Sequence, residues 1–188
     1  MRIGIFGGSF NPPHLKHKEI VVMSLEENYL DIVIVVPTFD NYNKKNLISF
    51  KDRCNMLNIM FRSVNNVFVS DVSKDSRLQY TIDILNYYKN IYKDSDIYFM
   101  CGVDNVLELD TWKNYQDIIS NYKLLVFSRE NYNLSRLDKN ILDRITFLDL
   151  GNNHISSTNI RKELKLKNNV DEIDKNVLKY IKKNNLYN

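Results

Sequence analysis

Short apolar runs alternate along the chain with longer segments in which apolar residues recur at helical spacing. The short runs are expected to form strands, and they cover residues 2–6, 31–36, 67–70, 96–101, 123–127 and 145–150. The run 31–36, DIVIVV, is nearly all apolar, which is typical of a parallel strand with both faces buried. The helical segments cover residues 15–29, 49–63, 80–92, 112–120, 157–166 and 171–184. This alternation predicts an α/β protein with a doubly wound parallel sheet.

The length of the chain limits how many domains it can form. Its 188 residues correspond to one domain of ordinary size, which can bury a core without help from disulfides or metals. No repeat or linker interrupts the pattern, so we expect a single domain over residues 1–188. The helices predicted within residues 155–188 are expected to pack on the rest. Residues 130–139, the least regular segment, are expected to form a surface excursion.

Charge and cysteine content narrow the class of protein. The net charge of +3 suits an enzyme that handles phosphorylated ligands but is too small to indicate a nucleic-acid partner. Cys54 and Cys101 each lie in an apolar stretch, which favours reduced thiols over a disulfide. No signal peptide is visible, and no apolar run approaches the ~18 residues that span a bilayer. We therefore expect a cytoplasmic protein with neither a membrane nor a nucleic-acid partner.

Glycine and proline are scarce and gather beyond the ends of predicted strands. Four of the five glycines and all three prolines follow a strand: Gly7, Gly8, Gly102, Gly151, Pro12, Pro13 and Pro37. Ligands of open α/β sheets bind at the carboxyl ends of strands, close to where the strand order reverses. Turns need glycine and proline in any case, so this pattern alone supports a ligand edge and ordinary turns equally.

The segment GGSFNPPHLKH at residues 7–17 joins the first strand to the first helix and carries the strongest chemical signal. Its glycines allow a ligand to approach the backbone closely. His14 and His17 share one face of a helix start, where both can donate to an anion. Surface polarity or a metal pair would also explain two histidines, but a metal needs further ligands and the remaining histidine is His154. The segment matches neither a G-x-G-x-x-G dinucleotide loop nor a Walker A loop, and we expect no metal held by the protein.

A second segment, HISSTNIRKEL at residues 154–164, joins the last strand to a helix. Ser156 and Ser157 are good helix-capping residues, and Ser157 shares a helical face with Arg161. An ordinary helix cap would explain this segment by itself. Beside residues 7–17, it would form a second phosphate cradle at the same sheet edge, which suggests a triphosphate held between the two.

Both segments resemble signatures of the nucleotidyltransferase superfamily of adenylyl and cytidylyl transferases, namely a glycine pair with HxGH and the string ISSTxIR. Within it, the chain is most similar to the bacterial nicotinate-nucleotide adenylyltransferases. Further segments carry that resemblance: RCNML at 53–57, QYT at 79–81, GVD at 102–104 with Trp112 beyond it, and the tail at 177–187. The resemblance implies a Rossmann-like nucleotide-binding fold and adenylyl transfer from ATP to nicotinate mononucleotide. The products would be nicotinate adenine dinucleotide, in NAD biosynthesis, and pyrophosphate.

The resemblance also implies the roles of individual residues. The catalytic residues would be His14, His17 and Arg161. The ATP-binding residues would be Gly7, Gly8, Ser9, Phe10, Gly102, Asp104, Ile155, Ser156 and Ser157. The mononucleotide-binding residues would be Lys44, Lys45, Arg53, Tyr80, Thr81 and Trp112. ATP is expected to be a co-substrate with Mg²⁺, which the nucleotide and water would hold in place of a protein cage.

Three departures from the family pattern bear on these roles. Lys16 replaces the glycine of HxGH, and its ammonium is hypothesised to supplement phosphate binding. Asn11 replaces an aspartate before the first proline. The family's P-P-H-[KR] loop is absent: residues 37–45 read PTFDNYNKK, and Lys44 or Lys45 is expected to supply the missing basic group.

Two alternative functions keep part of this pattern. A phosphopantetheine adenylyltransferase, or another enzyme acting on a small phosphate, would share the chemistry and both signatures, although the stretch from Gly102 to Trp112 argues against it. A regulatory module would keep affinity for ATP without catalysis. The lysine at position 16 and the altered basic loop keep that second alternative open.

Overall fold

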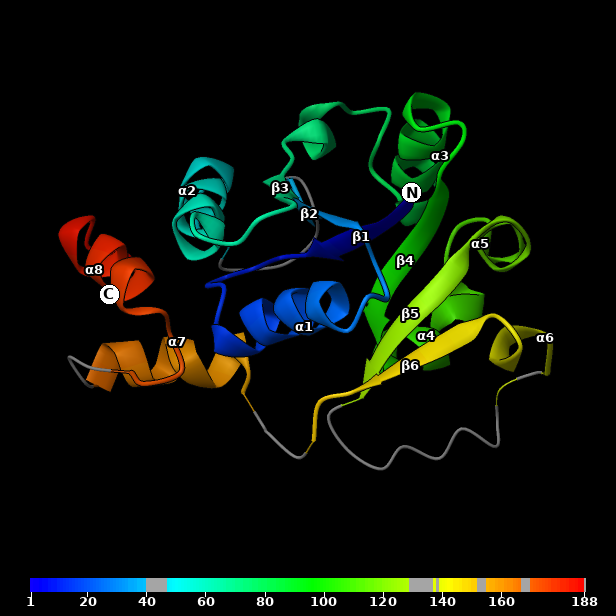
Figure 1. Ribbon diagram of the computed structural model, residues 1–188. Helices are drawn as coiled ribbons and strands as arrows, with labels where there is room; N and C mark the ends of the chain where they lie inside the picture. Colours follow the sequence, from blue (N-terminus) through cyan, green and yellow to red (C-terminus); the bar gives the residue numbers. More distant parts are fainter. Residues whose placement is uncertain (40–46, 129–136, 138, 152–154, 167–169, 188) are drawn as a thin grey trace.

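The computed structural model describes residues 1–39, 47–128, 137, 139–151, 155–166 and 170–187. Its centre is a six-stranded parallel sheet in the order β3-β2-β1-β4-β5-β6 (Figure 1). The strands are β1 (Arg2–Gly8), β2 (Ile32–Pro37), β3 (Val67–Val69), β4 (Asp96–Gly102), β5 (Lys123–Ser128) and β6 (Ile145–Asp149). The chain runs outward from β1 to β3, returns to the centre at β4 and then runs outward the other way. The predicted doubly wound sheet is therefore confirmed, and its order reverses between two strands that end in glycine.

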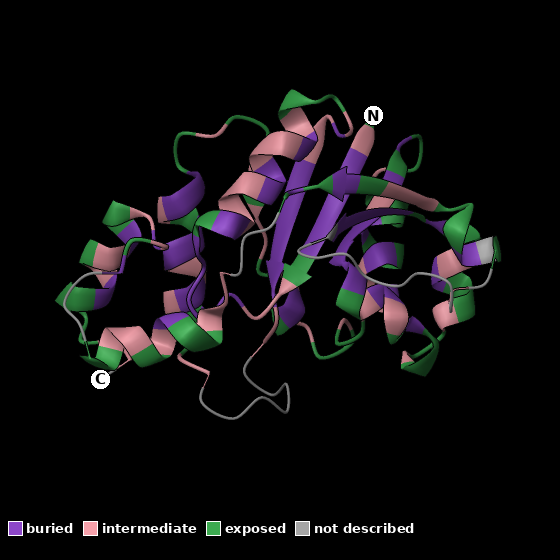
Figure 2. Cartoon of the chain, turned by 90° about the horizontal axis from the view of Figure 1, so that it is seen from below, coloured by how far each residue is buried: buried purple, intermediate pink, exposed green. Residues whose placement is uncertain are grey.

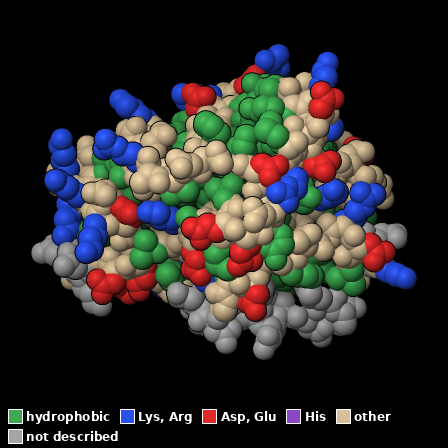
Figure 3. Space-filling model, in the orientation of Figure 1, with side chains coloured by type: hydrophobic (Ala, Val, Ile, Leu, Met, Phe, Trp, Pro, Cys, Tyr) green, Lys and Arg blue, Asp and Glu red, His purple; other side chains and the backbone are tan. Residues whose placement is uncertain are grey.

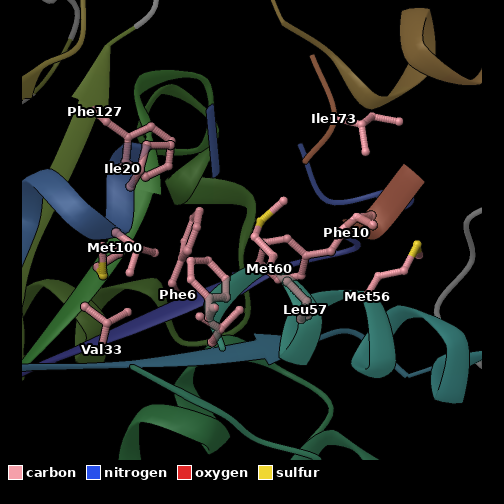
Figure 4. Close-up of a cluster of buried hydrophobic side chains, with 14 of the residues drawn as sticks. Phe6, Phe10, Ile20, Val33, Met56, Leu57, Met60, Met100, Phe127 and Ile173 are labelled. Atoms are coloured by element: carbon pink, nitrogen blue, oxygen red, sulfur yellow. The ribbon is translucent and has the colours of Figure 1, made fainter. Parts of the chain in front are cut away.

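Helices cover both faces of the sheet, and a hydrophobic core lies under each face (Figure 1). They are α1 (Leu15–Glu26), α2 (Phe50–Phe61), α3 (Thr81–Ile91), α4 (Val103–Leu107), α5 (Tyr115–Asn121), α6 (Lys139–Leu142), α7 (Ser157–Leu166) and α8 (Lys175–Lys183), with 3-10 turns η1 (Val72–Lys74) and η2 (Leu109–Thr111). One core contains side chains of α1, α2, α7 and α8, and Figure 4 shows part of it. The other contains side chains of α3, α4 and α5.

The strands supply residues to both cores, which explains their apolar sequences. Along β2, Val33 and Val35 enter the first core, while Ile34 and Val36 enter the second. Figure 2 shows the central strands buried over most of their length and the exposed residues on the outer sides of the helices. A strand with both faces buried cannot alternate apolar and polar residues, and this makes DIVIVV an unbroken run.

The two C-terminal helices pack on the rest of the chain. Ile160 of α7 and Val177 and Ile181 of α8 are buried in the first core. Tyr180 of α8 accepts a hydrogen bond from Asn55 Nδ2 of α2 at 2.8 Å. The helix predicted over residues 171–184 begins only at Lys175, because the Asp174 carboxylate accepts from two backbone amides of its first turn and so caps it.

The helix predicted over residues 112–120 differs most from the structure. Trp112 has an extended backbone after η2, with φ −86° and ψ 150°, and α5 begins at Tyr115. Asn114 precedes α5 in the left-handed region, with φ 52°, which asparagine tolerates better than most residues. This break takes Trp112 and Lys113 out of the helix and places them on the wall of a cavity.

The surface carries charges of both signs. Figure 3 shows acidic and basic side chains interspersed over the face seen in Figure 1, with lysine and arginine gathered toward the α8 end. Among the described residues, none of the helices combines the length and the apolar character needed to cross a membrane.

Candidate functional site

A cavity of about 420 Å³ opens at the carboxyl ends of the central strands. Gly7, Gly8 and Ser9 line it after β1, and residues 36–39 line it at the end of β2. Residues 78–81 before and at the start of α3, residues 99–102 of β4 and residues 111–113 form much of the remaining wall. Cavities that bind small molecules have this size and lie at this topological switch point.

Gly7 and Gly102, which both line the cavity, are glycines for different structural reasons. A Cβ atom on Gly7 would meet no atom within 4 Å, so packing does not require glycine there. The missing side chain instead leaves room for a ligand against the backbone. At Gly102, a Cβ atom would lie 2.3 Å from Asp104 Oδ1, so this glycine lets the Asp104 side chain pack against the end of β4.

The two histidines of the first motif form a stacked pair at the start of α1. His14 is the residue before the helix and is 1% exposed. The ring centroids of His14 and His17 lie 3.7 Å apart at an interplanar angle of 23°. The backbone N–H of His14 donates to His17 Nδ1 at 3.1 Å. An accepting Nδ1 in a neutral imidazole leaves the proton on Nε2, which makes that atom of His17 a hydrogen-bond donor.

The loop between β1 and α1 is fixed by buried groups. Phe10, with φ 46°, is 2% exposed, and its ring packs edge-on against that of Phe6 in the first core (Figure 4). It also packs edge-on against the ring of His17. Its ring thus lies in the core beneath the histidine pair. Asn11 precedes a cis peptide bond to Pro12, and its side-chain oxygen accepts from the Tyr187 hydroxyl at 2.9 Å. Burial raises the pKa of Tyr187, so its phenol stays protonated and can donate this bond.

The second motif contacts the same loop from the far end of the chain. Ser157 Oγ donates to Pro12 O at 2.9 Å, and Arg161 Nη1 donates to Asn11 O at 2.7 Å. Arg161 Nη2 also donates to Thr158 Oγ1 at 3.2 Å. The structure thus brings the two predicted phosphate-binding segments into direct contact. Ile155 and Ser156 are partly buried at the start of α7, where Ser156 Oγ accepts from the Asn159 backbone N–H.

Arg53 supports the same loop from beneath. It is fully buried in α2, and its guanidinium donates to Ile48 O at 3.1 Å and to Ser9 O at 3.0 Å. It does not belong to the described residues that line the cavity. These contacts indicate that Arg53 fixes the position of Ser9, whereas the sequence predicted a contact with the mononucleotide.

Three further predicted residues gather at one region of the cavity wall. Tyr80, Thr81 and Trp112 all line the cavity. The ring centroids of Trp112 and Phe99 lie 5.8 Å apart. Tyr80 is half exposed and Thr81 begins α3. The flat apolar ring of Trp112 beside neutral polar groups suits an aromatic ligand. Asp104 is exposed and its neighbour Asn105 lines the cavity in its place, while Lys44, Lys45 and His154 lie outside the described residues.

The sequence analysis did not single out Thr38 and Lys113, both of which line the cavity. Thr38 directly follows β2, so its place at a strand end was a usable signal. The place of Lys113 at the cavity could not be predicted, because the sequence pattern put this residue inside a helix. Cys101 also lines the cavity, and burial raises the pKa of its thiol, which therefore remains neutral.

Lys16, which replaces the family glycine, turns away from the histidine pair into the protein. It is fully buried, and its Nζ donates to Leu150 O at 2.7 Å and pairs with Glu19 Oε1 at 3.2 Å. The hypothesis that this ammonium supplements phosphate binding is not supported by that position. Lys16 instead ties α1 to the end of β6, the strand that leads into the second motif.

Replacing Lys16 with methionine is expected to lower the free energy of unfolding by about 2 kcal/mol, because the buried carbonyl of Leu150 loses a charged donor. Urea denaturation of the purified protein measures this change. Lys18→Met on the same helix is the control, because its partly exposed pair with Asp174 should contribute at most about 1 kcal/mol. Equal stability losses in the two variants would contradict the role given to Lys16.

The side chains at and around the cavity determine whether the protein itself can hold a metal ion. Within the described ranges, no group of three or more histidine, cysteine, aspartate or glutamate side chains is placed to hold a metal ion. The described residues of the cavity wall also include no carboxylate. A divalent cation in this site would therefore find no carboxylate ligand among the described residues of the wall.

Comparisons with known proteins agree with this geometry. Residues 5–163 match the family model described as cytidylyltransferase-like. A protein of Aliarcobacter butzleri, described as a probable nicotinate-nucleotide adenylyltransferase, is 35% identical over 95% of this chain and 96% of its own length. A protein of Clostridium acetobutylicum with the same description is 33% identical over 97% of each chain.

A solved structure shares the fold over nearly the whole chain. The nicotinic acid mononucleotide adenylyltransferase of Plasmodium falciparum, complexed with NaAD, superimposes with a TM-score of 0.81. The alignment covers 99% of this chain and 97% of that one at 24% sequence identity. At this identity the likeness shows the fold, which is the Rossmann-like arrangement expected from the sequence.

Proposed function

Because the chain belongs to the cytidylyltransferase-like family and, within it, to the nicotinate-nucleotide adenylyltransferases, we propose that it transfers the adenylyl group of ATP to nicotinate mononucleotide. The products are nicotinate adenine dinucleotide and pyrophosphate, and the reaction belongs to NAD biosynthesis. The chain is thus a nucleotidyltransferase.

The contact between the two motifs is the observation that carries this proposal. Ser157 and Arg161 bond to Pro12 and Asn11, so a triphosphate held by both motifs lies beside Ser9, which lines the cavity. The cavity then takes the second substrate. ATP contacts are assigned to Gly7, Gly8, Ser9, Gly102, Asp104, Ile155, Ser156 and Ser157, and mononucleotide contacts to Tyr80, Thr81, Trp112 and Lys44 or Lys45.

In the reaction, an oxygen of the mononucleotide 5′-phosphate attacks the α-phosphorus of ATP. The bond from that phosphorus to the bridging oxygen breaks, and pyrophosphate leaves with the electron pair. The attacking phosphate is already ionised at neutral pH, so the reaction needs no general base. Catalysis rests on positioning and on donors that neutralise charge on the phosphates, for which we propose His14, His17 and Arg161. Mg²⁺ accompanies ATP, with ligands from the nucleotide and water.

The direct test is release of pyrophosphate from ATP and Mg²⁺ with nicotinate mononucleotide, nicotinamide mononucleotide or phosphopantetheine as acceptor. We expect turnover with nicotinate mononucleotide to exceed that with the other two. Preference for phosphopantetheine would mean that the chain transfers adenylyl groups but to a different acceptor. ATP binding without turnover on any acceptor would favour the regulatory module. The proposed partners are these small molecules. Cys54 and Cys101 are not joined in a disulfide, which supports the proposal of a reducing, cytoplasmic location.

Thr38 offers a second, narrower test of the cavity as the substrate site. Its Oγ1 is buried and has no hydrogen-bond partner in the described part of the chain, although the residue lines the cavity. A buried hydroxyl left unpaired costs about 1–3 kcal/mol, and a substrate atom that bonds to it would recover this energy.

Replacing Thr38 with valine, which has nearly the same shape, is therefore expected to leave the free energy of unfolding unchanged or raised. The KM of one substrate should rise about five- to tenfold, as for the loss of one hydrogen bond. Ser73→Ala is the matched control on the same wall, because the Ser73 hydroxyl donates to Pro37 O at 2.6 Å and so serves the fold. Unchanged KM values with lower stability in Thr38→Val would refute a substrate contact.

A further inference from the structure

The cavity wall is almost uncharged. Among the described residues that line it, Lys113 is the only one with a charged side chain. The others are glycines, apolar residues and neutral polar residues such as Thr38, Ser73 and Gln79. Within the described part of this wall, a ligand group therefore meets one formal charge, and that charge is positive.

The structure fixes where this charge lies. Lys113 Nζ lies 4.2 Å from the centroid of the Tyr80 ring and 3.3 Å from Asp83 Oδ2. Tyr80, Thr81 and Trp112 line the same cavity, so the ammonium belongs to the region assigned to the mononucleotide. The N-terminus of α3, which begins at Thr81, adds a positive dipole end there.

The contacts of the ammonium hold it loosely enough to serve a ligand. Lys113 and Asp83 are 44% and 24% exposed in their side chains, and ion pairs with that exposure are weak. A cation over an aromatic ring is likewise a modest interaction at an exposed site. An incoming anion can therefore bind the ammonium without first breaking a strong contact.

We propose that Lys113 makes this enzyme select the acid form of the mononucleotide over the amide form by attracting the pyridine carboxylate. This inference rests on the proposed function. Nicotinate and nicotinamide mononucleotides have nearly the same shape and differ in one group, a carboxylate in the first and a neutral carboxamide in the second. Among the described lining residues the one charged group is this ammonium, and it distinguishes the two ligands by charge. The carboxylate forms an ion pair with Lys113 in which donor and acceptor are both charged, whereas the carboxamide offers only a neutral oxygen as acceptor.

The same ammonium could instead meet the 5′-phosphate, and this alternative makes a different prediction. Both mononucleotides carry that phosphate. Loss of a phosphate contact would therefore weaken the binding of both substrates equally, whereas loss of a carboxylate contact weakens the binding of the acid far more than that of the amide.

The experiment compares Lys113→Met with the unchanged chain, varying nicotinate or nicotinamide mononucleotide at saturating ATP and Mg²⁺. We expect kcat/KM for the acid to fall about tenfold, mainly through KM, which is the lower end for a bond to a charged group at a partly exposed site. The value for the amide should fall much less, because its carboxamide oxygen is neutral. Lys113→Arg should retain the preference for the acid, and so should Asp83→Asn, which removes the competing carboxylate.

A binding measurement separates this inference from catalysis. Trp112 is the single tryptophan of the chain and lines the cavity, so its fluorescence can follow each mononucleotide without turnover. The affinity of the unchanged chain for the acid should fall with added salt more steeply than its affinity for the amide. If the unchanged chain is active but the ratio of kcat/KM for the acid to kcat/KM for the amide is the same in Lys113→Met, the role of Lys113 is overturned and the proposed function stands. No turnover of either mononucleotide by the unchanged chain would overturn both.

Discussion

Replacing His17 with alanine is expected to lower kcat about 100-fold or more, the scale for removing one preorganised donor from a site that stabilises charge. His17 is held by its Nδ1, which accepts from the His14 backbone, and by the stacked His14 ring. Both contacts direct a donating Nε2 to one fixed place at the start of α1. Charge that develops on the phosphates would be stabilised there without reorganisation of the protein.

Steady-state pyrophosphate release measures this loss, and thermal denaturation checks that the variant is folded. Leu15→Ala is the matched control, because Leu15 lies in the same helical turn but is 37% exposed and outside the histidine stack. The control should keep nearly full activity. A loss in His17→Ala of less than about threefold would remove His17 from the catalytic set, since a preorganised donor contributes far more.

Replacing Arg161 with methionine is expected to cost about 100-fold in kcat/KM as well, for two reasons that act together. The guanidinium supplies positive charge beside the proposed phosphate site. Its 2.7 Å bond to Asn11 O also joins the two motifs, so its loss removes one of the bonds that hold the second motif against the first and leaves that of Ser157 to Pro12 O. Misplacement of one binding segment relative to the other is costly when catalysis depends on positioning.

Two comparison variants separate charge from geometry at this position. Arg161→Lys keeps the charge but not the planar guanidinium that reaches Asn11 O and Thr158 Oγ1 together, so its activity should lie between those of the methionine variant and the unchanged chain. Lys162→Met removes an exposed positive charge from the same helix and should have almost no effect. Similar losses in Lys162→Met and Arg161→Met would show that only net charge matters, contrary to the role proposed.

The sequence alone determined the sheet. All six predicted strands are present, because strands buried on both faces must be apolar throughout, and that signal is local. The doubly wound parallel arrangement followed from the alternation of strands and helices, whereas the order of the strands came from the structure. The two segments that the structure brings into contact also stood out in the sequence, since each combines capping residues, donors and tight turns within a short stretch. Helix boundaries were less certain where one residue decides them, as at Asn114 and Asp174.

Only the tertiary structure showed which polar side chains bond to distant parts of the chain and which line the cavity. Arg53 was predicted at the substrate and Lys16 at the phosphates, yet each donates to a backbone carbonyl that lies far away in sequence, Ser9 O and Leu150 O. Lys113 gave no signal in the sequence and lies on the cavity wall. In the sequence, a lysine or arginine looks the same whether its side chain bonds to the backbone or lines a cavity. Its role depends on whether folding brings a carbonyl or an open cavity within reach of its charged end, and partners 44 or 134 residues away leave no local pattern.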